Sequence, residues 1–253
     1  MRYIYVLVSL LFVSALGHAQ TNQIRSVLEK HQLDIELRAG VIIGGMSPVP
    51  IPVEIRKILK YSPEYNGMFE VMLTKWLSSK YGFASGIRVE NKGMETSAQV
   101  KAYHTKIVNQ GDQVEGYWTG DVTSVSKISY LTIPLLVNMQ MHERWRLQAG
   151  PYFSYNMTGK FSGKVSNGYL RENTPVGQKI EFKGEQYAAY DFSDELRNIA
   201  YGIQLSGQWK ATNNLHVLTQ STWGLSDIFK TDFETISFEM YPIYMSFGAS
   251  YQF

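Results

Sequence analysis

The stretch that decides the fold is WRLQAGPYFSYNM, residues 145–157. Its odd positions hold large or apolar residues from Trp145 to Met157, and its even positions hold mostly polar or small ones such as Arg146 and Gln148. Successive side chains of a β-strand point to opposite faces, so a strand here has one apolar and one polar face. The segment is therefore predicted to form one long strand.

The same two-residue period recurs along the chain. It is clear in IAYGIQLSGQWKA (residues 199–211) and in YPIYMSFGASYQF (residues 241–253). Shorter versions occupy residues 35–44, 69–74, 83–90, 130–139 and 215–225. Together these segments predict an all-β chain of eight antiparallel strands.

The connections between these strands alternate in length. Short links at residues 78–80, 141–143 and 212–214 separate long polar ones at residues 46–66, 94–126, 159–196 and 226–238. Outer-membrane barrels have short periplasmic turns, long outer loops and an even number of strands. We therefore expect an eight-stranded antiparallel transmembrane β-barrel with long extracellular loops, located in the outer membrane and surrounded by its lipid.

Alternation alone does not separate this barrel from a soluble one, because the two differ only in which face points inward. Strand length favours the membrane: segments of ~12 residues exceed the ~5–6 of soluble sheets and suit the ~9–11 needed to cross a bilayer. Aromatic residues near strand ends, such as Trp145 and Tyr155, fit the interfacial girdles of such barrels. Pro134, Pro151 and Pro242 fall inside the strands, where we expect bulges or strand ends.

The first 19 residues, MRYIYVLVSLLFVSALGHA, have the parts of a secretory signal: Arg2, an apolar run and small residues at the end. The run is too short to cross ~30 Å of hydrocarbon as a helix, so a signal peptide is favoured over a membrane anchor. The predicted organisation is a signal peptide at 1–19, a short periplasmic segment at 20–33 and the barrel domain at 34–253.

Composition excludes several kinds of chemistry. The 253 residues include no cysteine, which excludes a disulfide framework, a thiolate metal site and a cysteine nucleophile. The net charge of +2, from 24 basic and 22 acidic residues, gives no field that would favour nucleic acid. We expect no nucleic-acid partner and no cofactor.

Catalytic and metal-binding patterns are weak. No two of the histidines considered, His31, His104, His142 and His216, have the spacing of metal ligands. The serines on the predicted strands lack the Gly-x-Ser-x-Gly motif of a nucleophilic serine; they are Ser206, Ser221, Ser246 and Ser250. Asp191, Asp194 and Glu195 form either a divalent-cation site or a solvated rim. We expect no catalytic and no metal residue; an outer-membrane lipid- or peptide-modifying enzyme, a hydrolase or acyltransferase, is the alternative.

Charged residues on the polar faces are the stronger signal. Six of them are predicted to point into the lumen: Glu36, Arg38, Glu70, Arg88, Glu90 and Arg146. The interior of an eight-stranded barrel is just filled by side chains, so these six are predicted to pair as a plug. A narrow porin or small-solute channel is the alternative.

Four segments carry a family resemblance: YLTIPLLVN (130–138), LQAGPYFSY (147–155), NIAYGIQLSGQW (198–209) and TWGLSDIF (222–229). They resemble the PorT-like outer-membrane β-barrel family of Bacteroidota, in which Pro134 and Pro151 belong to the recurrent pattern and Asp227 stands where asparagine is frequent. We expect a non-enzymatic barrel with a structural or interaction role. The resemblance implies an association with a secretion or gliding machinery, whose protein would be its partner. Residues 46–126 match no part of that pattern.

The last strand carries a second resemblance. Ser246, Gly248, Tyr251 and Phe253 fit a polar-x-Gly-x-x-aromatic-x-aromatic pattern that resembles the signal read by the barrel assembly machinery. The resemblance implies that this machinery captures the last strand by its edge during biogenesis.

Overall fold

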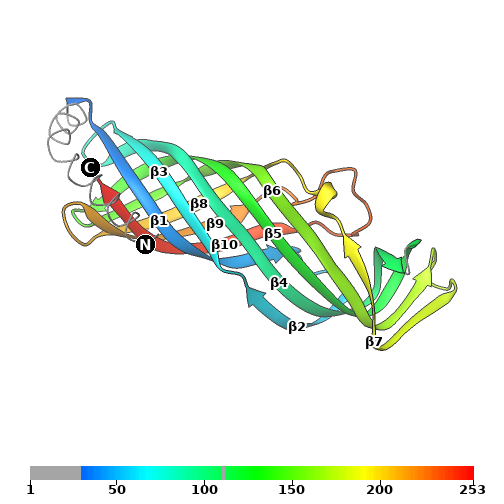
Figure 1. Ribbon diagram of the computed structural model, residues 1–253. Helices are drawn as coiled ribbons and strands as arrows, with labels where there is room; N and C mark the ends of the chain where they lie inside the picture. Colours follow the sequence, from blue (N-terminus) through cyan, green and yellow to red (C-terminus); the bar gives the residue numbers. More distant parts are fainter. Residues whose placement is uncertain (1–29, 110–111) are drawn as a thin grey trace, which may run out of the picture.

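The computed structural model describes residues 30–109 and 112–253, which are mostly β-strand (Figure 1). The predicted signal peptide at 1–19 lies outside the described residues, as do residues 20–29 of the predicted periplasmic segment. The ten strands and one short helix are β1 (Leu33–Ser47), β2 (Ile55–Pro63), β3 (Asn66–Trp76), β4 (Tyr81–Asn109), β5 (Asp112–His142), β6 (Trp145–Glu172), β7 (Lys179–Asp191), η1 (Ser193–Glu195), β8 (Ile199–Lys210), β9 (Leu215–Gly224) and β10 (Tyr241–Gln252).

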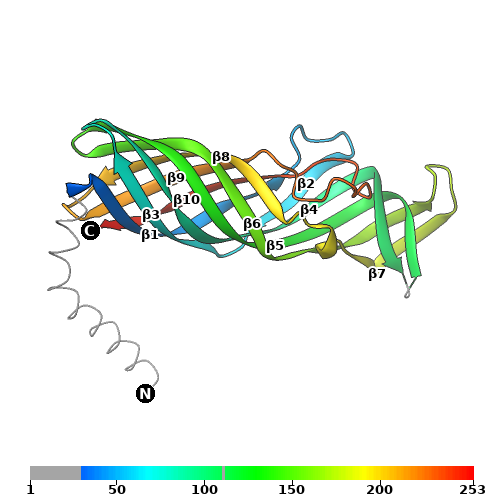
Figure 2. The ribbon, with the colours of Figure 1, turned by 90° about the horizontal axis from the view of Figure 1, so that it is seen from above.

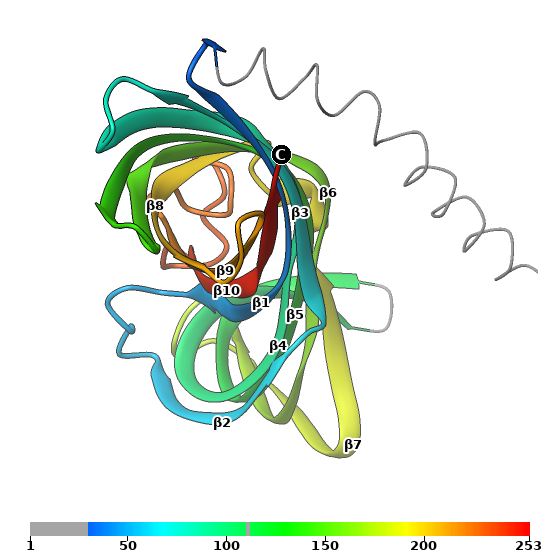
Figure 3. The ribbon, with the colours of Figure 1, turned by 90° about the vertical axis from the view of Figure 1, so that its left-hand side faces the viewer.

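Eight of these strands close into an antiparallel ring in the order β1, β3, β4, β5, β6, β8, β9 and β10, with β10 pairing back onto β1 (Figure 3). The predicted eight-stranded barrel is confirmed. The remaining two strands lie beside the ring: β2 pairs with β4, and β7 pairs with β6 and touches β4 at Val108. Short turns and both ends of the described barrel, at β1 and β10, share one end of the ring.

The outer surface of the ring is apolar, and its interior is mostly polar, with one small apolar cluster of Met72, Ala84 and Leu136. Exposed apolar side chains on its strands include Val41, Phe69, Ile87, Ile133, Phe153, Ile203, Val217 and Phe247. Buried inward side chains include Thr132, Asn138, Gln148, Gln204, Gln208 and Gln220. Exposed aromatics mark the two edges of the apolar band, with Tyr155, Tyr201 and Trp223 at one edge and Trp145, Trp209 and Tyr251 at the other. This polarity suits a ring surrounded by lipid.

Two of the predicted long polar loops are strands, so that part of the prediction was wrong. Residues 94–109 belong to β4 and residues 112–126 to β5, which are 29 and 31 residues long. Residues 159–196 are mostly the end of β6 and β7. Residues 46–66 contain β2. Crossing a bilayer takes ~9–11 residues, so more than half of β4, β5 and β6 lies beyond it.

We call this projecting part, formed by β2, β7 and residues 94–109, 112–126 and 157–172, the extension. Figures 1 and 2 show it leaving the ring at the end opposite the C-terminus. Its interior is apolar: the buried core there includes Val100, Tyr103, Ile107, Trp118, Val122, Phe161, Val165, Leu170, Phe182 and Tyr190. The connection after β9 folds onto this core, where Phe229 packs edge-on against Phe161 at 4.9 Å between ring centroids.

A bulge on β4 turns the apolar side chains of its outer part toward this core. On β4 the buried side chains are at even-numbered positions up to Val100 and at odd-numbered positions from Tyr103, because the pairing with β5 shifts between these residues. Ala102 takes a left-handed φ of 54° at this bulge. An extra residue reverses which side chains face inward, so one strand serves both the lumen and the core above it.

The strand prolines are accommodated without the expected bulges at Pro134 and Pro151. The β5–β6 pairing is interrupted between Pro134 and Val137, opposite Tyr152 and Ala149, and resumes in unchanged register. Pro242 lies near the start of β10, opposite Met46. The ring therefore loses ladder bonds locally where proline lacks an amide hydrogen.

Candidate functional site

The centre of the lumen holds a row of three charged residues on adjacent strands. Arg38 on β1 is the register partner of Glu70 on β3, which in turn pairs with Arg88 on β4. The Glu70 carboxylate accepts from both guanidinium groups, with Nη1–O distances of 3.2 Å to Arg38 and 3.2 Å to Arg88. One carboxylate thus bridges two arginines.

The other three predicted lumen residues continue this row in both directions. Arg38 Nη2 lies 2.9 Å from Glu36, and Arg88 Nε lies 3.1 Å from Glu90. Glu36 also pairs with Arg146 of β6. Since β6 is four strands from β1 in either direction around the ring, the Glu36–Arg146 pair spans the lumen.

Two charged residues that the sequence analysis missed complete the set. Lys92 Nζ lies 3.1 Å from Glu90, and Asp34 lies 3.7 Å from Arg146. Both share the even numbering of their inward neighbours, but the predicted strands stopped short of them. The result is an alternating series of four acids and four bases, which we call the charge ladder: Asp34, Arg146, Glu36, Arg38, Glu70, Arg88, Glu90 and Lys92.

Neutral side chains brace the charge ladder. Gln208 of β8 donates to Glu36 at 2.8 Å, and Arg88 donates to Gln204 of β8 at 2.9 Å. Thr132 donates to Glu90 at 2.8 Å. The side chains of Arg38, Glu70 and Arg88 are 0% exposed. Charges removed from water are costly unless each has partners, and here the partners come from strands on opposite sides of the lumen.

An aromatic cage closes the outer end of the charge ladder. The Lys92 Nζ lies 5.6, 5.4 and 5.5 Å from the ring centroids of Tyr130, Tyr152 and Tyr244. Cations are attracted to aromatic faces at such distances, most strongly where water is excluded. Directly along the strand, Met94 belongs to the apolar core of the extension. Lys92 therefore marks the boundary between a polar interior and an apolar one.

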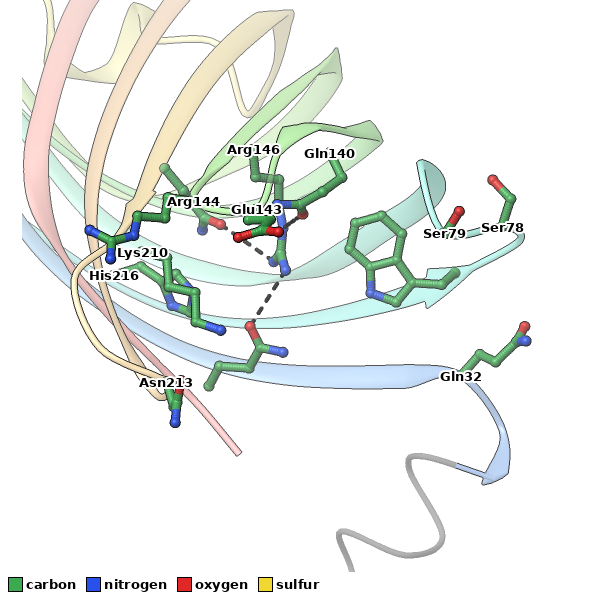
Figure 4. Close-up of a pocket in the computed structure, with 13 residues that line it drawn as sticks. Gln32, Ser78, Ser79, Gln140, Glu143, Arg144, Arg146, Lys210, Asn213 and His216 are labelled. Atoms are coloured by element: carbon green, nitrogen blue, oxygen red, sulfur yellow. Dashed lines mark hydrogen bonds between the residues drawn. The ribbon is translucent and has the colours of Figure 1, made fainter.

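The opposite end of the lumen is an open vestibule of about 810 Å³, shown in Figure 4. Its basic side chains, Arg144, Arg146 and Lys210, outnumber its acid, Glu143. Arg146 forms its inner end, held by Gln140 at 3.3 Å and packed with its guanidinium carbon 5.0 Å from the Trp76 ring centroid. Solvent entering from this end meets the charge ladder at Arg146.

The residues with catalytic side-chain types do not assemble into a reactive site. His216 and Ser250 are register partners beside the vestibule, but among the described residues neither His216 Nδ1 nor Ser250 Oγ has a hydrogen-bond partner. A nucleophile and its base need such a contact. His104 lies in the extension, 3.4 Å from Glu115, while His31 and His142 are exposed.

The acidic cluster of the sequence analysis lies around η1. Asp191 accepts from the amide of Ser193 at 2.9 Å, and Glu195 lies 3.9 Å from Lys230. Within the described residues, no group of three or more His, Asp or Glu side chains is arranged to hold a metal ion.

The four residues of the terminal pattern divide between the two faces of β10. Ser246 is buried in the lumen, whereas Tyr251 and Phe253 are exposed and their rings meet edge-on at 5.1 Å. Gly248 lies against the backbone of β1, where a Cβ would come within 2.7 Å of the Gly40 Cα. The Phe253 amide donates to Ile35 at 3.1 Å, which fastens the end of the chain to the first strand.

Comparison with solved structures gives distant similarities to outer-membrane proteins. The attachment invasion locus protein Ail of Yersinia pestis, in complex with the heparin analogue sucrose octasulfate, is 8% identical, with a TM-score of 0.40 over 87% of this chain and 99% of that one. The outer membrane protease OmpT of Escherichia coli is 11% identical (TM-score 0.35, 87% and 96% covered), and Neisserial surface protein A is 8% identical (0.31, 87% and 97%).

Comparison of the sequence with known proteins and with protein-family models identifies the family. No curated protein matches the chain. In the described part of the chain no helix is long and apolar enough to cross a membrane. The family model described as outer membrane protein beta-barrel domain matches residues 18–230, which is most of the sequence. The chain belongs to the outer membrane protein beta-barrel domain family and resides in the outer membrane.

Proposed function

We propose that the protein is a non-enzymatic outer-membrane anchor whose ring is closed to solutes and whose extension contacts a partner outside the membrane. The observation that carries this proposal is the continuity of β4, β5 and β6. Each runs for 28 to 31 residues from the ring into the extension. A contact made on the extension is therefore fixed rigidly to the membrane.

The charge ladder supports a closed ring. A solute path needs a continuous wet passage, but Glu36, Arg38, Glu70 and Arg88 are fully buried and the Glu36–Arg146 pair crosses the lumen. Above them the Lys92 cage and the core of the extension add an apolar layer. Ions would have to break several buried pairs to pass, so the closed anchor is favoured over the narrow porin.

The resemblance to the PorT-like family of Bacteroidota supports a more specific role. We propose that the partner is a protein of a secretion or gliding machinery. In biogenesis, Ser246, Gly248, Tyr251 and Phe253 would present the last strand to the barrel assembly machinery. The exposed aromatic pair at the end of β10 supports this second role.

Planar-bilayer recording tests the closed ring. Purified protein should give no conductance steps over a range of voltages, and a known open porin inserted under the same conditions provides the positive control. Regular conductance steps from the unmodified protein would contradict the anchor and favour the porin.

Site-specific photo-crosslinking in intact cells tests the contact role. A photoreactive amino acid at Tyr187, which is 62% exposed on the extension, should give a discrete protein adduct that mass spectrometry identifies. The matched control is Phe247, exposed on the lipid face of the ring, which should give lipid adducts only. If Tyr187, Val108 and Val176 all give no protein adduct, the extension is not a contact surface.

A further inference from the structure

The wall of the molecule has a gap between β1 and β2. The pairing of β1 with β3 ends at Ile42 and Asn66, whereas its pairing with β10 continues to Ser47. Residues 43–47 therefore have a strand on one side only. Next along the wall is β2, which pairs with β4 and not with β1. A closed barrel has no such unpaired edge.

Side chains replace the missing ladder across this gap. The Tyr61 hydroxyl of β2 donates to the carbonyl of Gly44, and the amide of Met46 donates to Met94 Sδ at 3.2 Å. At Gly45 there is no side chain, and a Cβ would come within 2.8 Å of Met94 Sδ. The wall here consists of two long side chains facing a glycine, instead of a hydrogen-bonded strand.

Behind the gap lies a cavity of about 400 Å³. Most of its lining is apolar and comes from β1, β2, β4, β5, β6 and the connection after β9, including Met46, Ile55, Met94, Val100, Phe161 and Met240. Its volume lies in the range of small-ligand pockets, ~300–1,000 Å³. The cavity can therefore take an apolar molecule or one hydrocarbon chain.

The shape of β2 serves this cavity. Its pairing with β4 shifts between Ile55 and Lys57 and again between Ile58 and Lys60. These two irregularities replace the two-residue period with a spacing of three, so that Ile55, Ile58 and Tyr61 all line the cavity. A regular strand would have turned Ile58 away from the cavity that Ile55 and Tyr61 line.

The level of the gap indicates where its occupant comes from. Gly45 pairs with Ile243, which pairs with Trp223, an exposed aromatic residue at the outer edge of the lipid band. The connection between β1 and β2 exposes Val49, Ile51 and Val53, the last at 76%. Apolar side chains so exposed at this edge suit contact with the outer leaflet.

The charges at the gap favour an anionic headgroup. Arg56 and Lys57 are exposed on β2, and within the described part of the chain neither forms an ion pair with an acid. Lys60, also exposed, lies 3.4 Å from the partly exposed Glu95. Basic groups beside an apolar cavity at the membrane edge match both parts of an acidic lipid.

We propose that this cavity holds one hydrocarbon chain of an anionic outer-leaflet lipid, which enters sideways between β1 and β2 while Arg56 and Lys57 bind the headgroup. The assignment concerns a site apart from the charge ladder and does not depend on the partner of the extension. It explains the gap, the bulges of β2 and the exposed apolar residues of the β1–β2 connection by one function.

The test is photolabelling of the full-length protein reconstituted in vesicles, with a diazirine placed on the acyl chain of phosphatidylglycerol. Peptide mapping should find label on cavity residues such as Met46, Met94 and Met240, and phosphatidylcholine carrying the same chain should label them at least threefold less. Ala98→Trp, which fills the cavity from β4, should reduce that labelling about tenfold, while Ala249→Trp on the lipid face of β10 should not. Heat-modifiable gel migration verifies that both variants are folded.

Several outcomes would overturn the proposal. One is label confined to the lipid band, at residues such as Phe247, with none in the cavity; another is cavity label that Ala98→Trp leaves unchanged. Labelling by a diazirine fatty acid but not by the phospholipid would show that a free amphiphile, and not a membrane lipid, is the occupant. If Ala98→Trp does not fold, Lys57→Glu together with Arg56→Glu gives a second test: it should abolish the preference for phosphatidylglycerol, and a retained preference would refute the headgroup assignment.

Discussion

The lumen of the ring and the core of the extension are built from the same strands, yet their chemistry is opposite. On β5 the even-numbered side chains face inward throughout: Asn138 and Thr132 in the ring are polar, whereas Val122 and Trp118 in the extension are apolar. The outward side chains reverse as well, from Leu135 and Ile133 to Lys127 and Asp121. The reversal takes place near Tyr130, in the wall of the Lys92 cage.

This difference follows from what surrounds each half. Lipid accepts apolar side chains on the outside of the ring, so apolar residues gain nothing by moving inward. Charges and amides fill most of the lumen, together with one small apolar cluster of Met72, Ala84 and Leu136. Water surrounds the extension, so the hydrophobic effect drives its apolar residues inside. The ring is therefore held by specific pairs and the extension by packing.

The largest expected effect comes from breaking the charge ladder at its centre. Glu70→Ala leaves Arg38 and Arg88 buried without their shared carboxylate. Removal of one partner of a buried pair costs about 3–5 kcal/mol, and here Arg38 and Arg88 each lose one of their two carboxylate partners. We expect a large fall in the unfolding temperature in detergent, measured by circular dichroism or by heat-modifiable migration.

Glu95→Ala is the matched control, because Glu95 pairs with Lys60 at the surface, where such pairs contribute ~0–1 kcal/mol. Arg88→Ala should act like Glu70→Ala, and Lys164→Ala, exposed on β6, like the control. If Arg88→Ala kept the stability and opened ion conductance, the charge ladder would be a gate and the protein a channel.

A second large effect should be confined to the extension. Trp118 is fully buried and meets Phe182 edge-on at 5.5 Å, so Trp118→Ala should destabilise this core by about 3–5 kcal/mol. Limited proteolysis should then cut within residues 94–126, while heat-modifiable migration of the ring persists. Loss of the folded ring in the same variant would show that the two halves fold as one unit.

A moderate effect is expected at the end of the ring. Deleting Phe253 removes one member of the aromatic pair with Tyr251, together with the hydrogen bond that the Phe253 amide donates to the carbonyl of Ile35. The amount of assembled protein in outer-membrane fractions should fall, measured against Phe69→Ala, which removes an exposed aromatic from β3. Equal assembly of the deletion and unmodified chains would refute the assembly role of the terminal pattern.

The smallest effect concerns Asp227, in the connection that covers the extension core. Burial raises its pKa above the ordinary aspartate value of 3.8, although the amide of Met240 donates to it at 2.9 Å. Because the pKa is raised in the folded state, the contribution of this carboxyl to the free energy of unfolding is fully present below pH 3.8. That contribution is lost as the pH rises through the folded-state pKa. Asp227→Asn keeps the acceptor without the charge.

We therefore expect Asp227→Asn to be neutral or slightly stabilising at pH 7 and to flatten the acid-side pH dependence of unfolding. Asp232→Asn, exposed on the same connection, is the control and should change neither. A clear loss of stability in Asp227→Asn would show that the negative charge itself is needed.

The lumen was largely predictable, because alternation assigns Glu36, Arg38, Glu70, Arg88, Glu90 and Arg146 to one face of their strands. Lys92 has the same parity as Arg88 and Glu90, but it follows the point at which outward residues turn polar, and the predicted strand ended there. The same change of outward polarity made residues 94–126 look like a loop. The pairing of Arg146 with Glu36 was not predictable, because it joins strands on opposite sides of the ring.

The sequence by itself determined the ring: the two-residue period gives the strands, their number and the polar face, because backbone geometry alternates side chains whatever surrounds them. The tertiary structure decided the rest. Bulges near Ala102 and along β2 choose which side chains face inward, and the gap between β1 and β2 depends on where each pairing stops. Such features arise from contacts between strands that are far apart in the sequence. The alternation of residues within one strand does not predict which distant strand it contacts, or where that pairing ends.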